Sequence, residues 1–275
     1  NIRADLVAPL VTQPAPTQRV EAQVAISKRV DLDLKFVESA GFVTPNSPRS
    51  HLADEFRVIK RPLIANAMGK GAAPVAQGNL IMVTSALPGE GKSFTAINLA
   101  LSIATELDNT VMLVDADVAR PSVLKRLGLT AAPGLLDVLV DNSVDLSKVL
   151  LKTNVDKLTI LPSGTQHARA TELLASDAMA ALLQDMASRY PDRIIIFDSP
   201  PLLQTTESRV LASHMGQVVM VVQAERTHQA AVKQALATIE SCPVKMLVLN
   251  QAEMPDTDGY GYGYGYGYGY GYGGQ

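Results

Sequence analysis

Apolar residues gather along this chain in short runs that begin after Asn79 and alternate with longer amphipathic stretches. The runs are rich in β-branched residues and bounded by turn-forming residues, which is typical of strands buried on both faces of a parallel sheet. They cover 80–85, 110–116, 157–163, 193–199, 217–224 and 244–250. Between these runs, apolar residues recur at the spacing of an amphipathic helix, as in 92–106, 177–189 and 227–240. This alternation predicts a doubly wound, mostly parallel α/β sheet.

The chain before the first strand is less regular. Residues 1–20 contain three prolines and indicate a loose arm. Residues 21–40 place Val30, Leu34 and Val37 at the spacing of an amphipathic helix.

A linker punctuated by prolines is expected over 44–51, and a second helix from near Asp54 to Arg61 and Pro62. After Pro255 the folded pattern ends and a low-complexity tail begins. The sequence therefore predicts three parts, namely an arm over 1–49, one α/β domain over 50–253 and a tail over 254–275.

Composition narrows the class of protein only slightly. A chain of 275 residues that is 47% hydrophobic can bury a large core, and its net charge of −3 gives no reason to expect nucleic acid as a partner. The single cysteine, Cys242, excludes an intramolecular disulfide and is typical of a reducing compartment. The apolar runs are far shorter than the ~20 residues that span a bilayer. We therefore expect a cytoplasmic protein.

A phosphate-binding loop is predicted between the first strong strand and the next helix. The stretch "ALPGEGKS" has the form A-x4-G-K-S, with Ala86 where the usual P-loop pattern has glycine. Glycines allow backbone N–H groups to approach phosphates, the lysine reaches the outer phosphates and the serine hydroxyl faces Mg²⁺. The alternative is an ordinary strand–helix turn with a chance lysine. Predicted nucleotide contacts are Gly89, Glu90, Gly91, Lys92, Ser93 and Phe94.

Two predicted strands end in carboxylates. "IIIFDSPP" places Asp198 directly after four apolar residues, and "VMLVDADVARP" contributes Asp115 and Asp117. Strand ends of an open α/β sheet face the ligand crevice, so these side chains should converge on the loop. A lone acid at this position can simply cap a helix, whereas the set favours ATP with Mg²⁺. Predicted metal ligands are Ser93, Asp117 and Asp198.

Phosphoryl transfer also needs a group that receives the proton of the acceptor. One acidic strand end suffices for Mg²⁺, so a carboxylate of the Asp-x-Asp pair is free to serve a tyrosine phenol. We assign Asp115 as this base or orienting group, although Asp115 and Asp117 could exchange roles. The predicted catalytic residues are Lys92, Asp115, Asp117 and Asp198.

The tail supplies candidate acceptors. Residues 259–274 alternate glycine with tyrosine and hold seven of the chain's eight tyrosines. Glycine at every second position lets any of these side chains enter a narrow cleft. The competing interpretation is an adhesive Gly-Tyr tract. The predicted phosphoacceptors are Tyr260, Tyr262, Tyr264, Tyr266, Tyr268, Tyr270 and Tyr272.

These motifs in this order, with the tyrosine cluster, resemble the bacterial tyrosine kinases (BY-kinases) of exopolysaccharide synthesis. "HLADEFRVIKRPLIANA" is similar to the subgroup of exosortase-associated tyrosine autokinases. The resemblance implies a P-loop fold of the MinD/ParA type, ATP-dependent phosphorylation of the chain's own tyrosines between subunits of a ring, and a separate membrane polysaccharide co-polymerase as activator that recruits the kinase to the membrane. Asn250, at the end of the last strand, matches a frequent adenine contact of related proteins.

The family's subunit-contact motif Glu-x2-Arg-x2-Arg aligns with Asp54, Arg57 and Lys60, which we expect on one helical face. The alternative is that these residues form an ordinary solvent-exposed helix face without a subunit contact. The rival for the whole chain is a MinD/ParA-type ATPase switch with an interaction tail. Such switches carry a signature lysine where this chain has Leu87.

Overall fold

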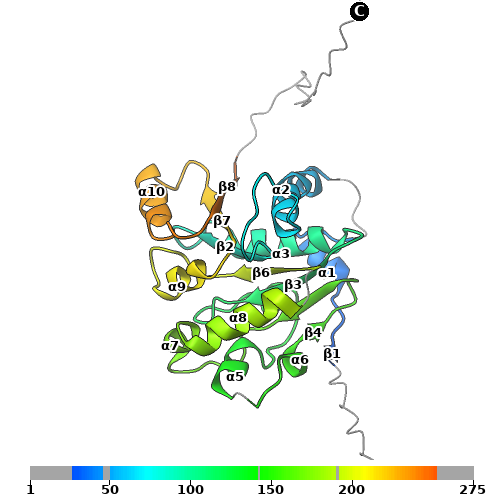
Figure 1. The fold of residues 1–275 in the computed structure, drawn as a ribbon. Coiled ribbons are helices and arrows are strands. Elements are labelled where there is room, and N and C mark those ends of the chain that lie inside the picture. Colours follow the sequence, from blue (N-terminus) through cyan, green and yellow to red (C-terminus); the bar gives the residue numbers. More distant parts are fainter. Residues whose placement is uncertain (1–26, 46–49, 142, 190–191, 253–275) are drawn as a thin grey trace, which may run out of the picture.

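The structure is a computed structural model that describes residues 27–45, 50–141, 143–189 and 192–252. An eight-stranded sheet runs through this part of the chain in the order β1-β4-β5-β3-β6-β2-β7-β8. All its pairings are parallel except that of β4 with β5. The predicted doubly wound, mostly parallel sheet is therefore confirmed (Figure 1).

Six strands correspond to the predicted apolar runs. They are β2 (Leu80–Ser85), β3 (Thr110–Asp115), β5 (Leu158–Leu161), β6 (Arg193–Asp198), β7 (Gln217–Gln223) and β8 (Val244–Asn250). Two strands of two residues each, β1 (Lys28–Arg29) and β4 (Leu151–Lys152), were not predicted. All six residues of β2 are buried, as expected for a central strand covered on both faces.

Helices cover both faces of the sheet (Figure 1). Leu80 and Met82 of β2 belong to the core on one face, and Ile81 and Val83 to the core on the other, which follows the two-residue period of a strand. The first core packs against α5 (Leu135–Val140), α6 (Leu146–Val149), α7 (Ala170–Leu174), α8 (Asp177–Arg189), α9 (Glu207–Ser213) and α10 (Gln229–Ala237). The second packs against α1 (Leu34–Ser39), α2 (His51–Ala67), α3 (Lys92–Ala104) and α4 (Val123–Arg126).

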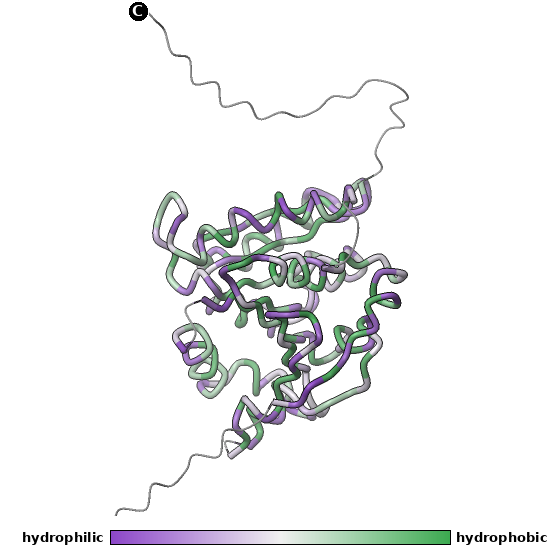
Figure 2. The backbone as a smooth tube through the Cα atoms, turned by 90° about the vertical axis from the view of Figure 1, so that its right-hand side faces the viewer, coloured by the Kyte–Doolittle hydropathy of each residue, from purple (hydrophilic) through white to green (hydrophobic). Residues whose placement is uncertain are grey.

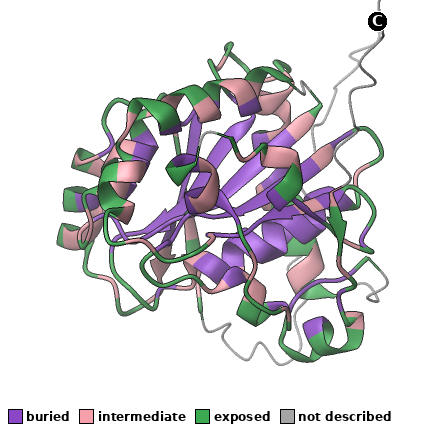
Figure 3. Cartoon of the chain, turned by 90° about the horizontal axis from the view of Figure 1, so that it is seen from below, coloured by how far each residue is buried: buried purple, intermediate pink, exposed green. Residues whose placement is uncertain are grey.

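The sheet is the buried centre of the domain (Figure 3), and the hydrophobic segments of the backbone gather inside it (Figure 2). Helix α3 is buried over most of its length because it is covered by α2 as well as by the sheet. The P-loop helix is therefore held rigidly between two layers.

The helix predicted over 21–40 is wrong in its extent. Residues 21–26 lie outside the described ranges, and the rest forms β1 followed by a six-residue α1. Asp33 starts α1 because its side chain accepts hydrogen bonds from the backbone N–H groups of Lys35 and Phe36.

Parts of the predicted arm pack on the domain. The N–H of Val30 donates to the carbonyl of Lys152 over 2.9 Å, and the N–H of Leu32 donates to the side chain of Asn154 over 2.8 Å. Leu32, Val37 and Phe42 are buried in the same core as α3.

The second predicted helix is longer than expected. Helix α2 begins at His51, capped by Ser50, and continues through Pro62 to Ala67. Leu63 is fully buried beyond the proline, so packing against the domain core extends a helix that local sequence signals would end. None of the helices in the described ranges is long and apolar enough to cross a membrane.

Candidate active site

The P-loop joins β2 to α3, and its last glycine is fixed by two constraints. Gly91 has φ +96°, and a Cβ atom at this position would lie 2.0 Å from the side-chain nitrogen of Asn250. Gly89 has φ +88° but open space around it. The left-handed backbone favours glycine at both positions, whereas steric crowding adds to this only at Gly91.

Glu90 holds the loop in place through its side chain. It is 2% exposed, one carboxylate oxygen accepts the N–H of Leu87 over 2.7 Å, and the other accepts the hydroxyl of Thr227. Its carbonyl accepts the side-chain amide of Asn250 over 2.9 Å. The Glu90 side chain therefore ties the loop to the segment after β7, and only its backbone N–H is left for the predicted phosphate contact.

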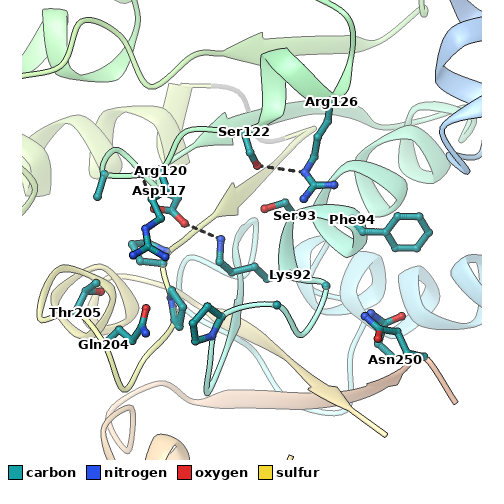
Figure 4. Close-up of a pocket in the computed structure, with 17 residues that line it drawn as sticks. Lys92, Ser93, Phe94, Asp117, Arg120, Ser122, Arg126, Gln204, Thr205 and Asn250 are labelled. Atoms are coloured by element: carbon teal, nitrogen blue, oxygen red, sulfur yellow. Dashed lines mark hydrogen bonds and ion pairs between the residues drawn. The ribbon is translucent and has the colours of Figure 1, made fainter. Parts of the chain in front are cut away.

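Lys92, at the start of α3, is shared by two carboxylates. Its Nζ atom lies 2.7 Å from Oδ2 of Asp117 (Figure 4) and 3.8 Å from Oδ1 of Asp198. Asp115 is the register partner of Asp198 on the neighbouring parallel strand. The structure thus brings the four predicted catalytic residues together.

The carboxylate of Asp115 is buried and accepts hydrogen bonds through one of its two oxygens. Its Oδ2 accepts the backbone N–H groups of Ser122 and Val123, each over 3.0 Å, while Oδ1 has no hydrogen-bond partner among the described residues. Burial and the negative charge of Asp198 raise the pKa of Asp115 to about 7, against the opposing effect of the two N–H groups. An acid with this pKa exchanges protons readily near neutral pH.

Asp198 is fully buried, and neither carboxylate oxygen has a hydrogen-bond partner among the described residues. Burial raises its pKa to about 6, although the charge of Lys92 lowers it. Buried carboxylate oxygens that accept no hydrogen bond, together with the hydroxyl of Ser93, form the hard oxygen donor set that Mg²⁺ prefers. The described residues contain no group of three or more His, Cys, Asp or Glu positioned to hold a metal ion. Mg²⁺ needs only one or two carboxylates when nucleotide phosphates supply other ligands, so these residues fit the ion.

A cleft of about 920 Å³ opens above these groups, and we call it the nucleotide cleft. Lys92, Ser93 and Asp117 line it together with Arg120 and Arg126 (Figure 4). Arg126 donates to the hydroxyl of Ser122 over 3.4 Å. Sequence analysis did not find Arg126, because the spacing of the two arginines matches no motif and α4 is only four residues long. The cleft therefore joins three cations to the acidic strand ends.

Phe94 and Asn250 also line the nucleotide cleft. The ring of Phe94 lies 5.5 Å from that of Phe42 and 6.4 Å from that of Phe56, centroid to centroid. These contacts hold an aromatic wall on the side of the cleft where β8 ends. Contact of Phe94 and Asn250 with a nucleotide base stays a prediction.

The expected subunit-contact face stays a prediction, and its three positions differ in exposure. Asp54 and Arg57 are exposed and form an ion pair with each other. Lys60 is 3% exposed, and its ammonium pairs with Glu106 over 2.7 Å. Six residues of an α-helix turn by about 600°, which places position 60 about 120° away from position 54.

The seven tail tyrosines and Tyr190 lie outside the described residues.

Comparison with known proteins agrees with this geometry. A family model described as an AAA domain matches residues 78–251. The tyrosine-protein kinase YwqD of Bacillus subtilis is 30% identical over 74% of this chain and 82% of its own length. The tyrosine-protein kinase ptk of Acinetobacter johnsonii is 33% identical over 65% of this chain, but this match spans only 24% of that relative.

Solved structures give the same result. The VpsO kinase domain has a TM-score of 0.59 and 28% identity, with 74% of this chain and all of that chain covered. A ParA family ATPase from Chlorobium tepidum has a TM-score of 0.53 and 20% identity over 66% of this chain and 76% of that one, which is a likeness of fold.

The fold and the site define an α/β domain of the P-loop class, in which a phosphate-binding loop and acidic strand ends meet at one cleft. Within that class, the chain belongs to the AAA-domain family as a bacterial tyrosine kinase (BY-kinase). Its assignment to the exosortase-associated subgroup stays a prediction.

Proposed function

We propose that this chain transfers the γ-phosphoryl group of ATP to the tyrosines of its own C-terminal tail. The observation that carries the proposal is the shared cation: Lys92 lies between Asp117 and Asp198, and Asp115 is the register partner of Asp198 on the neighbouring strand. A bound Mg²⁺ would neutralise charge on the phosphates, and Ser93, Asp117 and Asp198 would hold it.

The chain's own residues divide the remaining work. The P-loop N–H groups and Lys92 bind and orient the phosphates. Asp115 orients the acceptor phenol and receives its proton. Phe94 and Asn250 position the base of the nucleotide.

The tail is well placed to supply the acceptors. The described structure ends two residues after β8, and Gln251 lines the nucleotide cleft. From Gln251 to Tyr272 an extended chain spans at most ~70 Å, at ~3.3 Å per residue. The acceptors can therefore reach their own site or that of a neighbouring subunit, and we propose exchange between subunits of a ring.

Radiolabelled ATP and mass spectrometry test this proposal. The full chain with ATP and Mg²⁺ should gain phosphate on tail tyrosines, and Lys92→Met should lower the rate by about 10²–10³-fold. A variant with the seven tail tyrosines replaced by phenylalanine should gain none, while its retained Tyr190 serves as an internal control. Label confined to Tyr190, or phosphate release without labelling, would contradict transfer to the tail, and the second result would favour an ATPase switch.

A mixing experiment tests the route between subunits. Lys92→Met chains supply intact tails without activity, and the seven-phenylalanine variant supplies activity without tail acceptors. Label on the Lys92→Met tail in the mixture requires transfer from one chain to another. No label in the mixture, with a labelled wild-type chain, would contradict exchange.

We further propose that the kinase acts in exopolysaccharide synthesis or export, activated and recruited to the membrane by a separate polysaccharide co-polymerase. The support is the family resemblance. Co-purification of the chain with a membrane protein from its own cells, identified by mass spectrometry, tests this role. Unchanged polysaccharide output after Lys92→Met is introduced into the cells would contradict it.

A further inference from the structure

A second cleft, of about 440 Å³, lies between α1 and α4, and we call it the basic cleft. Its lining includes two cations, Lys125 and Arg126, and the apolar side chains of Phe36, Phe42 and Pro121. Its volume lies in the range of small-ligand sites, about 300–1,000 Å³. The basic cleft is therefore large enough to hold one substituted aromatic side chain.

The two cations of the basic cleft form no ion pair with a carboxylate in the described part of the chain. Lys125 also makes no side-chain hydrogen bond to a described residue, and Arg126 donates one, to the hydroxyl of Ser122 over 3.4 Å. Both cations are exposed. A guanidinium and an ammonium side by side, with most of their donors unused, suit the oxygens of a phosphate group.

An aromatic ring lies next to these cations. Phe36 is 43% exposed although its side chain is large and apolar. The ring packs against the residue that follows α4 by two positions, because a Cβ atom on Gly128 would lie 3.1 Å from it. The ring is thus held beside Lys125 and Arg126, while part of its surface stays open to a ligand.

The basic cleft adjoins the nucleotide cleft. Ser122 and Arg126 line both. The rings of Phe42, in the basic cleft, and Phe94, in the nucleotide cleft, lie 5.5 Å apart between centroids. A phosphorylated product that leaves the nucleotide cleft therefore meets the basic cleft next to it.

We propose that the basic cleft binds a phosphotyrosine of the chain's own tail, with its phosphate on Lys125 and Arg126 and its ring against Phe36. This proposal rests on the kinase function proposed above, because that reaction makes the ligand. Phosphorylation adds about −1.5 to −2 charges to a tyrosine at neutral pH, which complements two cations. A phosphoserine brings a similar charge but no ring to pack on Phe36.

The tail is long enough to place its tyrosines in this cleft. Gln251 lines the nucleotide cleft, and Tyr260 follows it by nine residues. An extended chain of nine residues spans up to ~30 Å. The glycines on either side of each tail tyrosine carry no side chain that could collide with the walls.

Peptide binding to the full chain with its seven tail tyrosines replaced by phenylalanine tests the site, since this chain has no phosphorylated tail of its own. The probe is fluorescent Gly-Tyr-Gly-Tyr-Gly-Tyr-Gly with phosphate on the central tyrosine, followed by anisotropy. Lys125→Ala should weaken its binding at least tenfold, and Lys125→Arg should stay within threefold. The control Lys233→Ala removes an exposed lysine from α10, on the opposite face of the sheet, and should stay within twofold.

The ring contact is tested with the same peptide carrying phosphoserine at its centre, which should bind at least tenfold more weakly. Phe36→Ala should bring the affinity for the phosphotyrosine peptide close to this lower value. Equal affinity for the two phosphopeptides, or equal losses in Lys125→Ala and Lys233→Ala, would overturn the proposal, because either result indicates attraction to net charge alone. So would full displacement of the probe by equimolar inorganic phosphate.

Failure of the basic cleft and failure of the kinase function give different results. Phosphotyrosine on the tail of the wild-type chain, without binding of the peptide, would overturn the basic cleft alone. Peptide binding that depends on Lys125 and Phe36, without any phosphotyrosine after incubation of the wild-type chain with ATP and Mg²⁺, would overturn the kinase function. The basic cleft would then remain a phosphotyrosine site.

Discussion

The ammonium nitrogen of Lys92 lies 2.7 Å from Asp117 and 3.8 Å from Asp198, so one cation serves two carboxylates at the ends of neighbouring strands. Asp115 adds a third buried carboxylate as the register partner of Asp198. A single lysine does not balance three acids at this depth, and burial raises the pKa of both Asp115 and Asp198.

Replacement of Asp198 by asparagine should therefore stabilise the metal-free chain. The pKa of Asp198 is raised from 3.8 to about 6 in the folded state. Ionisation of this group therefore destabilises the fold: the unfolding free energy decreases as pH rises from about 4 to about 6, and the full loss is present above pH 6. At pH 8 in EDTA, Asp198→Asn should raise the unfolding free energy by about 2–3 kcal/mol in urea titrations. The gain should shrink towards pH 4. Equal or lower stability of the variant at pH 8 would contradict the charge imbalance.

Gly91 and Gly89 provide a matched pair in the P-loop. Gly89→Ala adds only left-handed strain, about 1–2 kcal/mol, because its surroundings are open. Gly91→Ala adds the same strain and displaces the Asn250 amide from the carbonyl of Glu90, about 0.5–1.5 kcal/mol more. Urea unfolding without nucleotide should separate the two variants by this second amount.

A double variant isolates the collision. Asn250→Ala removes the colliding side chain, so the added cost of Gly91→Ala should largely disappear in the Asn250→Ala background. Gly89→Ala should cost the same in both backgrounds. Additive effects of Gly91→Ala and Asn250→Ala would show that the two residues do not crowd each other.

Glu106 should make the domain sensitive to acid. Partial burial raises its pKa, but Lys60 and the nearby arginines outweigh this, so the pKa is lower in the folded chain than its ordinary value of 4.5. A lowered pKa stabilises the fold above the unfolded pKa, and this stability is lost as pH falls through the folded one. Glu106→Gln should thus be less stable than wild type at pH 7, and the gap should close below pH ~4.

The measurement is thermal unfolding across this pH range, and the exposed Glu240→Gln on the far edge of the domain is the control. Glu240→Gln should follow the wild-type profile. A constant gap between Glu106→Gln and wild type at all pH values would show that the loss comes from packing and not from charge.

Asp137 should stabilise the contact between the segments around Gly134 and Thr165. Asp137→Ala removes the acceptor for the N–H groups of Gly134 and Thr165, which costs about 1–3 kcal/mol of unfolding free energy. Amide exchange at these two residues should accelerate, because their N–H groups lose the acceptor. Asp137→Asn retains one acceptor oxygen and should show milder effects. Unchanged amide exchange in Asp137→Ala would show that other contacts hold these two segments in place.

The central strands could be predicted because they are apolar on both faces, a pattern that needs no knowledge of their partners. Strands β1 and β4 could not, since two residues carry no period. The extent of α2 was missed because packing of Leu63 outweighs the local signal of Pro62.

The candidate site shows the same division. Convergence of Asp115 and Asp198 follows from the rule that parallel strands end at one edge. The burial of Lys60 does not follow from its helix, because its partner Glu106 is far along the chain. The inward turn of Glu90 depends on Thr227, 137 residues away.

Strand β8 ends at Asn250, and Asn250 and Gln251 line the nucleotide cleft, so the polypeptide leaves the domain at the rim of its own ATP site. Whatever is fused after Gln275 is tethered to that rim by 24 residues and reaches it at a local concentration of order mM. An affinity tag or fluorescent protein at the C-terminus would therefore compete with ligands of this cleft or obstruct its opening. For assays, such a label should be attached to the N-terminus of the chain.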